Sequence, residues 1–399
     1  MNYFFALSLF VLSFSASAAK RPIKEGPWRF EMKATYAVIP FVIEFKYRGE
    51  KLIGTLLNGK EKIPLRNIDI KKDLILVPLQ HYENGLELTV QNDSTVKGDF
   101  VRYNKNPEVR NPVFGKVGKD SARYTGNFEK PKAHFDGQWA VTLKEEDGKE
   151  SKGIVLINQD GSRFTGTIMS PTGDYRYMEG YLNGELFEGA SFDGVYNYVF
   201  KGRVEKHTME AAIEANWLTK VTGNKDANAK MPDPYKETKL DKMAFKFGDI
   251  DGRKVTLEDP KFKDRAVIVT FFGSWCPNCI DETKYLIPWY HKNHMRGVEI
   301  VALAFERDLD EMHARMQLTK TVKKFKIPYT VLLAGSTTED KPMDKIPTLK
   351  NFISFPTTVF LNKKHEVVKV HAGFNGPATG KFFEEWKVEF EKDVEGLLK

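Results

Sequence analysis

The chain has 399 residues, 41% of them hydrophobic, which is enough for two or three domains with buried cores. Its 61 basic and 54 acidic residues leave a formal net charge of +7, a mild attraction to acidic partners or membrane surfaces. This balance is not a nucleic-acid-binding signature. With two cysteines the chain cannot be a disulfide-stapled scaffold, so it must depend on its cores.

Residues 1–19 have the features of an export signal. A short apolar run ends in Ser15-Ala16-Ser17-Ala18-Ala19, where small residues at alternate positions suit signal peptidase. The run is shorter than the about 20 residues that span a membrane. It lacks the usual basic leader, so an uncleaved anchor or a disordered end is the alternative. We expect a periplasmic protein that is soluble after cleavage, without stable membrane insertion.

Residues 20–222 predict an all-β region, a barrel or sandwich. Short β-rich runs alternate with Gly, Asn and Asp turns, and Asp160-Gly161 and Asn183-Gly184 are tight-hairpin signals. Helical periodicity is scarce here. A group of tyrosines could line a ligand cavity, although packing of an ordinary sheet also explains it. These are Tyr175, Tyr177, Tyr196 and Tyr198.

An internal duplication would explain two matches within this region. Gly26-x-Trp28 recurs as Gly137-x-Trp139, and the run at 49–56 recurs at 161–168. The two offsets, 111 and 112 residues, agree within one. The predicted repeats are about 20–130 and 131–222, although glycine and hairpin coincidences are common in β proteins.

Beyond a polar linker at 223–239, strands and helices alternate. The expected elements of the domain at 240–399 are a hairpin around Asp251-Gly252, a buried strand at 266–272, a helix at 280–293, a buried strand at 298–304, a helix at about 309–325 with an acidic start at 306–311, an added strand at 329–333, a hairpin of strands at 357–361 and 366–370, and a helix at about 379–398. This order predicts an α/β sandwich with a mixed sheet.

Both cysteines lie in Cys276-Pro277-Asn278-Cys279, between a buried strand and a helix. Such a pair can close a disulfide or hold one thiol as a thiolate. The helix dipole and the free N–H groups at a helix N-terminus favour negative charge, which lowers the thiol pKa. A bond that closes so short a loop removes little entropy from the unfolded chain. In an oxidising compartment the pair therefore indicates redox chemistry and not a staple.

The element order and the run at 272–279 resemble the thioredoxin fold, and more narrowly the TlpA/ResA type of exported thiol-disulfide oxidoreductase. The hairpin at 251–257, Glu282, and Phe355-Pro356-Thr357-Thr358 match features of that family. The resemblance covers about residues 240–399. It implies a thioredoxin-like α/β domain and a cis bond before Pro356, where an ordinary trans turn is the alternative.

The position of each cysteine predicts its role. Cys276, at the helix N-terminus and more exposed, is the expected attacking thiolate, and Cys279 would resolve the mixed disulfide by attacking Cys276. A cis Pro356 would bring the carbonyl of Phe355 beside the disulfide, where it can pair with a substrate backbone. Trp275 would shield the disulfide and contact substrate, although core packing alone would also explain it.

Glu282 is the expected proton partner of the cysteine pair. It would lie one turn below the cysteines, where a carboxylate could accept the proton of Cys279. Thr270 occupies the strand position at which thioredoxin carries a buried aspartate, which makes Glu282 the more plausible substitute. The alternative is an acid that merely complements the helix dipole.

Metal binding competes with redox chemistry at the same thiols. Cys276 and Cys279 followed by His291 and His294 approach a zinc-ligand order, but the histidine spacing is shorter than usual and the cysteines follow a deeply apolar strand. Copper delivery through the two thiols is a second alternative. We expect neither a metal nor another cofactor.

The predicted function is reduction or exchange of disulfides in client proteins outside the cytoplasm. The resemblance favours the reducing direction, with electrons from a membrane thiol carrier and a role in cytochrome c maturation. The alternative is a binding module, in which the β-rich half captures a partner and the thioredoxin-like half is a scaffold.

Overall fold

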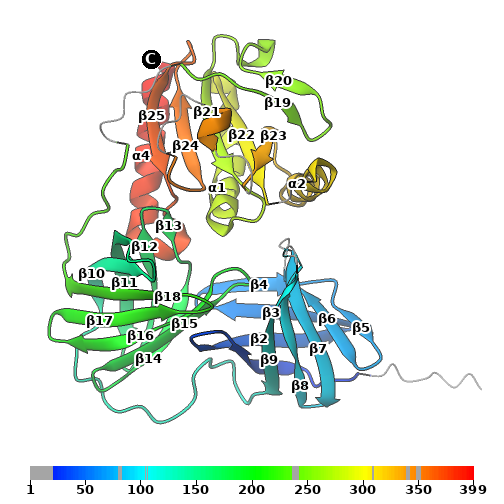
Figure 1. Ribbon diagram of the computed structural model, residues 1–399, viewed down its shortest axis with the longest axis vertical. Helices are drawn as coiled ribbons and strands as arrows, with labels where there is room; N and C mark the ends of the chain where they lie inside the picture. The colour runs from blue at the N-terminus through cyan, green and yellow to red at the C-terminus, as the bar shows by residue number, and fades with distance from the viewer. Residues whose placement is uncertain are drawn as a thin grey trace, which may run out of the picture.

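The computed structural model describes residues 21–79, 83–103, 105, 107–235, 242–307, 310–337, 342–346 and 352–399. The expected export signal and part of the expected linker therefore lie outside the described residues. Three sheets account for the described strands, two in the β-rich region and one in the C-terminal domain. Figure 1 shows the two β sheets side by side beneath the C-terminal domain.

The first sheet is an open antiparallel half-barrel in the order β4-β3-β2-β1-β9-β8-β7-β6-β5. Alternate residues of its longer strands face a core, as the period of a half-buried strand requires. Its strands are β1 (Gly26–Lys33), β2 (Val38–Arg48), β3 (Lys51–Asn58), β4 (Glu61–Leu65), β5 (Asp69–Lys71), β6 (Leu74–Pro78), β7 (Asn84–Asn92), β8 (Thr95–Arg102) and β9 (Val109–Val117).

The second sheet closes into an eight-stranded barrel, because β11 pairs with both β10 and β12, with the short β13 appended to β12. Closure leaves no free edge between these strands. The strands are β10 (Gly137–Glu145), β11 (Glu150–Asp160), β12 (Arg163–Ser170), β13 (Gly173–Asp174), β14 (Met178–Asn183), β15 (Leu186–Phe192), β16 (Asn197–Glu205), β17 (Thr208–Glu214) and β18 (Leu218–Lys225).

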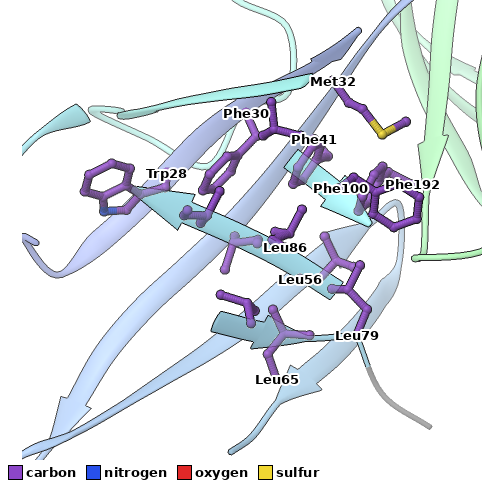
Figure 2. Packing of buried hydrophobic residues seen from close by; sticks show 14 of the residues in the cluster. Trp28, Phe30, Met32, Phe41, Leu56, Leu65, Leu79, Leu86, Phe100 and Phe192 are labelled. Atoms are coloured by element: carbon purple, nitrogen blue, oxygen red, sulfur yellow. The ribbon is translucent and has the colours of Figure 1, made fainter. Parts of the chain in front are cut away.

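The half-barrel and the barrel share part of one hydrophobic core. Phe192 of the barrel packs among the half-barrel residues, with its ring stacked on Phe41 at a centroid distance of 3.8 Å (Figure 2). Arg123, in the connection between the sheets, is 2% exposed and donates to the carbonyl oxygens of Ala190 in the barrel and Leu57 in the half-barrel. The sheets are therefore joined by apolar packing and by buried hydrogen bonds.

The two recurring Gly-x-Trp segments adopt the same local structure. Gly26 and Gly137 have φ angles of 117° and 104°, a conformation that favours glycine. Each buried indole donates to the carbonyl oxygen four residues earlier, at 3.0 Å for Trp28 and 2.9 Å for Trp139. This equivalence favours the proposed duplication. The predicted domain and repeat boundaries stay predictions.

The C-terminal domain has the predicted mixed sheet, in the order β20-β19-β23-β22-β21-β24-β25. Strands β21, β22 and β23 are parallel, and the outer strands are antiparallel to their neighbours. The strands are β19 (Lys246–Asp249), β20 (Lys254–Thr256), β21 (Ala266–Phe272), β22 (Val298–Glu306), β23 (Thr330–Ser336), β24 (Thr357–Leu361) and β25 (Val367–Ala372). The thioredoxin-like fold class is confirmed.

Helices cover one face of this sheet. Apolar residues of α1 (Pro277–Asn293), α2 (Glu311–Phe325) and α4 (Lys381–Leu398) form one core cluster with that face. The opposite face packs against loop residues, among them Ile346, which directly follows the short α3 (Pro342–Lys345). Short 3-10 turns occur at Pro260–Phe262, His294–Arg296 and Pro377–Thr379. Every residue of β21 and β22 is buried, as the largely apolar runs at 266–272 and 298–304 predicted.

Candidate active site

The cysteine pair lies where β21 ends and α1 begins. Cys276 and Cys279 form a disulfide with their Cα atoms 5.3 Å apart. Cys276 is the N-cap, its Sγ accepts from the backbone N–H of Cys279 at 3.3 Å, and Pro277 occupies the first turn. Cys276 is 5% exposed and Cys279 0%, so both sulfur atoms are shielded and only a small difference favours access to Cys276.

Phe355 and Trp275 flank the outer sulfur. The carbonyl oxygen of Phe355 lies 3.7 Å from Sγ of Cys276, and the Phe355–Pro356 bond is cis, as the resemblance implied. The Trp275 ring packs edge-on to Phe355 at 5.6 Å, and its indole N–H donates to the carbonyl oxygen of Phe305 at 2.8 Å. The structure therefore brings the predicted substrate-binding residues to Cys276.

Glu282 is a buried carboxyl on the first turns of α1. Its side chain is 1% exposed, and its Oε1 accepts a hydrogen bond from Thr358 at 2.6 Å. Burial raises its pKa from 4.5 to about 7, against the smaller lowering effect of the Thr358 hydroxyl. A carboxyl with this pKa can both accept and donate a proton near neutral pH.

The raised pKa predicts a pH-dependent stability. Between pH 4.5 and about 7 the folded chain binds a proton at Glu282 that the unfolded chain releases. The contribution of Glu282 to the free energy of unfolding is therefore fully present below pH 4.5. It is lost as the pH rises through the pKa of Glu282 in the folded chain, about 7. Relative to wild type, Glu282→Gln should have equal stability at low pH and be up to about 3 kcal/mol more stable at pH 8.

Denaturant unfolding of the two proteins across this pH range measures the difference. Glu205→Gln, which removes an exposed carboxylate from the barrel, is the matched control. A stability difference between Glu282→Gln and wild type that does not change with pH would contradict the assignment.

Sequence reasoning missed Glu306, which was assigned to the acidic start of a helix. It is instead the last residue of β22, 4% exposed, and accepts from the backbone N–H and the hydroxyl of Ser274 at 2.9 and 2.7 Å. Burial raises its pKa. Its position in the sequence could have indicated this contact. Glu306 and Ser274 lie at the carboxyl ends of two neighbouring parallel strands, β22 and β21, which meet at the same edge of the sheet.

The barrel also contributes to this site, which sequence reasoning did not foresee. The Asn278 side chain donates to the carbonyl oxygen of Asp174 at 3.0 Å. Arg176 pairs with Asp281, directly before Glu282 on α1, and with Asp193 of the barrel and Glu61 of the half-barrel. No local pattern marks these residues, because Asp174 and Asn278, Arg176 and Glu61, and Arg176 and Asp281 are each more than 100 residues apart in the chain.

A cavity of about 290 Å³ lies between the half-barrel, the barrel and the C-terminal domain. Cys276, Trp275 and Phe355 are among the residues that line it. Tyr196 lies in its wall and Tyr177 lines a separate cavity, so two of the four tyrosines considered for a ligand cavity do line one. A larger cavity, about 470 Å³, lies between residues 227–234 and α4 and contains neither cysteine. The smaller cavity is therefore the one with access to the redox pair.

The zinc arrangement considered from the sequence is wrong. His291 and Cys279 lie on the same helix, α1, 12 residues apart, which corresponds to about 18 Å at the rise of an α-helix. Within the described part of the chain, no group of three or more His, Cys, Asp or Glu side chains could hold a metal ion. No described helix has the length and apolar character to span a membrane.

Residues 232–384 match the family model named Redoxin. The C-terminal part of this chain is a Redoxin domain. The thiol-disulfide oxidoreductase ResA of Bacillus thuringiensis subsp. konkukian is 31% identical over 125 residues, and that of Bacillus subtilis (strain 168) is 29% identical over 129. These matches cover 31% and 32% of this chain and 64% of each relative.

Among solved structures, StoA from Bacillus subtilis matches with 21% identity and a TM-score of 0.27, over 36% of this chain and 96% of that one. The sequence matches span less than two thirds of the ResA proteins and leave the β-rich region outside the Redoxin match. The resemblance inferred from the cysteine motif is confirmed for the C-terminal domain.

Proposed function

We propose that this protein is a thiol-disulfide oxidoreductase that reduces or exchanges disulfides in client proteins through Cys276 and Cys279. The observation that carries the proposal is a disulfide at the N-terminus of α1 with the Phe355 carbonyl oxygen 3.7 Å from its outer sulfur. ResA relatives at about 30% identity support it.

In the proposed reaction, the reduced Cys276 thiolate attacks a client disulfide and Cys279 resolves the mixed disulfide. The start of α1 stabilises the thiolate through its free N–H groups, one of which already points at Sγ of Cys276. Glu282 takes the proton that Cys279 must release, and Phe355, Pro356 and Trp275 hold the client backbone beside the sulfur atoms.

The cellular setting belongs to the same proposal. After removal of residues 1–19 the protein acts in the periplasm, where a membrane thiol carrier supplies its electrons. Cytochrome c maturation is the process it serves. The proposed units are the β-rich region, which β18 extends from the expected boundary at 222 to Lys225, the linker that follows it, and the domain at 240–399.

Reduction of insulin by the reduced full-length protein tests the activity. Wild type should reduce insulin in a reaction that Cys276→Ser lowers to the uncatalysed rate, because no other thiolate lies beside the Phe355 carbonyl oxygen. Circular dichroism shows whether the variant remains folded. Equal rates for wild type and a folded Cys276→Ser variant would leave the binding-module alternative as the better account.

A further inference from the structure

The cavity beside the disulfide is enclosed by all three parts of the chain. Arg102 comes from the half-barrel, Tyr196 and Trp217 come from barrel turns, and Cys276 and Phe355 come from the Redoxin domain. Its volume of about 290 Å³ suits a small molecule. A folded protein domain cannot enter it while the β-rich region is docked.

Two arginines and two glutamates, Glu83 and Glu306, are the charged residues that line this cavity. Arg102 and Arg307 both line it, and neither forms an ion pair with any described residue. Partial desolvation lowers the pKa of both guanidinium groups, and repulsion from Arg102 lowers that of Arg307 further. The Glu306 carboxyl opposes this lowering for Arg307, but it forms no ion pair with either guanidinium group, so an anionic ligand that pairs with both would relieve their repulsion.

The two acids in the cavity wall are already engaged. The Glu83 carboxylate accepts from the Gln317 amide and lies 3.2 Å from Nε2 of His313. Glu306 accepts two hydrogen bonds from Ser274, and burial raises its pKa. The arginines are therefore the cavity's available charges.

One arginine is held close to the redox pair. The guanidinium carbon of Arg307 lies 4.2 Å from the ring centre of Trp275, the residue before Cys276. A carboxylate paired with these arginines would place the rest of a short molecule against Trp275 and Cys276.

We propose that this cavity binds a low-molecular-weight thiol or disulfide bearing a carboxylate, and that this compound exchanges with Cys276 while the β-rich region is docked. The inference rests on the proposed thiol-disulfide chemistry of Cys276 and adds a small-molecule substrate for the docked state to the client proteins. Arg102 and Arg307 are the groups that select the carboxylate.

The exchange balances in atoms and electrons. For a disulfide RSSR, the Cys276 thiolate forms a Cys276–SR bond as the S–S bond breaks, and RS⁻ leaves and takes a proton. The Cys279 thiolate then attacks Sγ of Cys276 and releases the second RS⁻. Two thiols are oxidised to the Cys276–Cys279 disulfide and RSSR is reduced to two RSH. With RSH in excess, the disulfide form is reduced by the reverse steps.

Three small disulfides of similar size test the selection. The reduced full-length protein is mixed with dithiodipropionate, bis(hydroxyethyl) disulfide or cystamine, and disulfide formation is followed over time. Dithiodipropionate should react about tenfold faster than the neutral probe at low salt. This preference should decline at high salt. A thiolate alone repels the anionic probe, so a preference for it reports the arginines.

Charge variants locate the selection. In Arg102→Gln/Arg307→Gln the ratio of anionic to neutral rates should fall to about one or below, whereas Arg102→Lys/Arg307→Lys should keep most of it. Arg203→Gln, which removes an exposed arginine from β16, is the matched control and should keep the full ratio.

Each contrary result has a distinct meaning. A wild-type ratio of one or less, or a ratio that the double glutamine variant retains, overturns the substrate assignment while leaving the redox function intact. Faster oxidation by insulin than by dithiodipropionate at equal disulfide concentration assigns the cavity to a protein segment and also overturns it. Failure of all probes to oxidise Cys276 removes the proposed function itself.

Discussion

Replacing Cys279 with serine is expected to leave clients covalently attached to Cys276 and to stop turnover. Cys279 is completely buried behind Cys276, whereas Cys276 lies beside the Phe355 carbonyl oxygen and lines the cavity. Resolution by Cys279 is an intramolecular step, and such steps have effective molarities of about 10⁵ M or more. Its loss should therefore lower the turnover rate by at least about a thousandfold.

Non-reducing gel electrophoresis after mixing reduced Cys279→Ser with a disulfide-containing client measures the trapped complex. Cys276→Ser is the matched control, since it removes one thiol from the same pair and should trap nothing. Trapping by Cys276→Ser and not by Cys279→Ser would reverse the assignment of the attacking and resolving cysteines.

The C-terminal domain could be predicted from sequence because its signals are local. The apolar runs of β21 and β22 and the Cys-x-x-Cys before a helix each specify their structure within a few residues. The position of Glu282, the proposed proton partner, could be predicted for the same reason, since it follows Cys279 by three residues on one helix.

For the β-rich region, only the all-β fold class could be predicted from the sequence. Its hairpins follow from turn residues such as Asp160-Gly161, but closure of the barrel requires β11 to pair with both β10 and β12. Whether a sheet closes or stays open depends on strand tilt and register over the whole sheet, which turn signals do not set. The open half-barrel and the closed barrel therefore look alike in sequence.

The contacts between the barrel and α1 could not be predicted from the sequence for a related reason. Arg176 lies in the connection between β13 and β14, where the sequence gives no sign of its partners. In the folded chain it pairs with acids from all three regions. Burial then raises the pKa of Asp193 and of Asp174, while Arg176 opposes both shifts. The interaction that docks the barrel onto α1 exists only at the level of tertiary structure.

Replacing Arg176 with methionine is expected to release the β-rich region from the Redoxin domain. The side chain of Arg176 is 7% exposed, and those of its partners Asp193 and Asp281 are 4% and 8% exposed. Removing one partner from buried ion pairs leaves uncompensated charges and costs about 3–5 kcal/mol. Methionine retains a Cβ at the left-handed backbone position, where φ is 66°, so the variant mainly tests the lost charge.

Two measurements distinguish loss of docking from general unfolding. Denaturant unfolding gives the cost in stability, and alkylation of the reduced protein with a bulky maleimide reports access to Cys276, which should rise in Arg176→Met. Arg203→Met is the matched control, because Arg203 is an exposed barrel arginine whose pair with Glu185 has 58% and 37% exposed side chains. Such a pair contributes about 1 kcal/mol or less. If Arg176→Met matches this control in both measurements, the buried cluster does not hold the β-rich region over the cysteines.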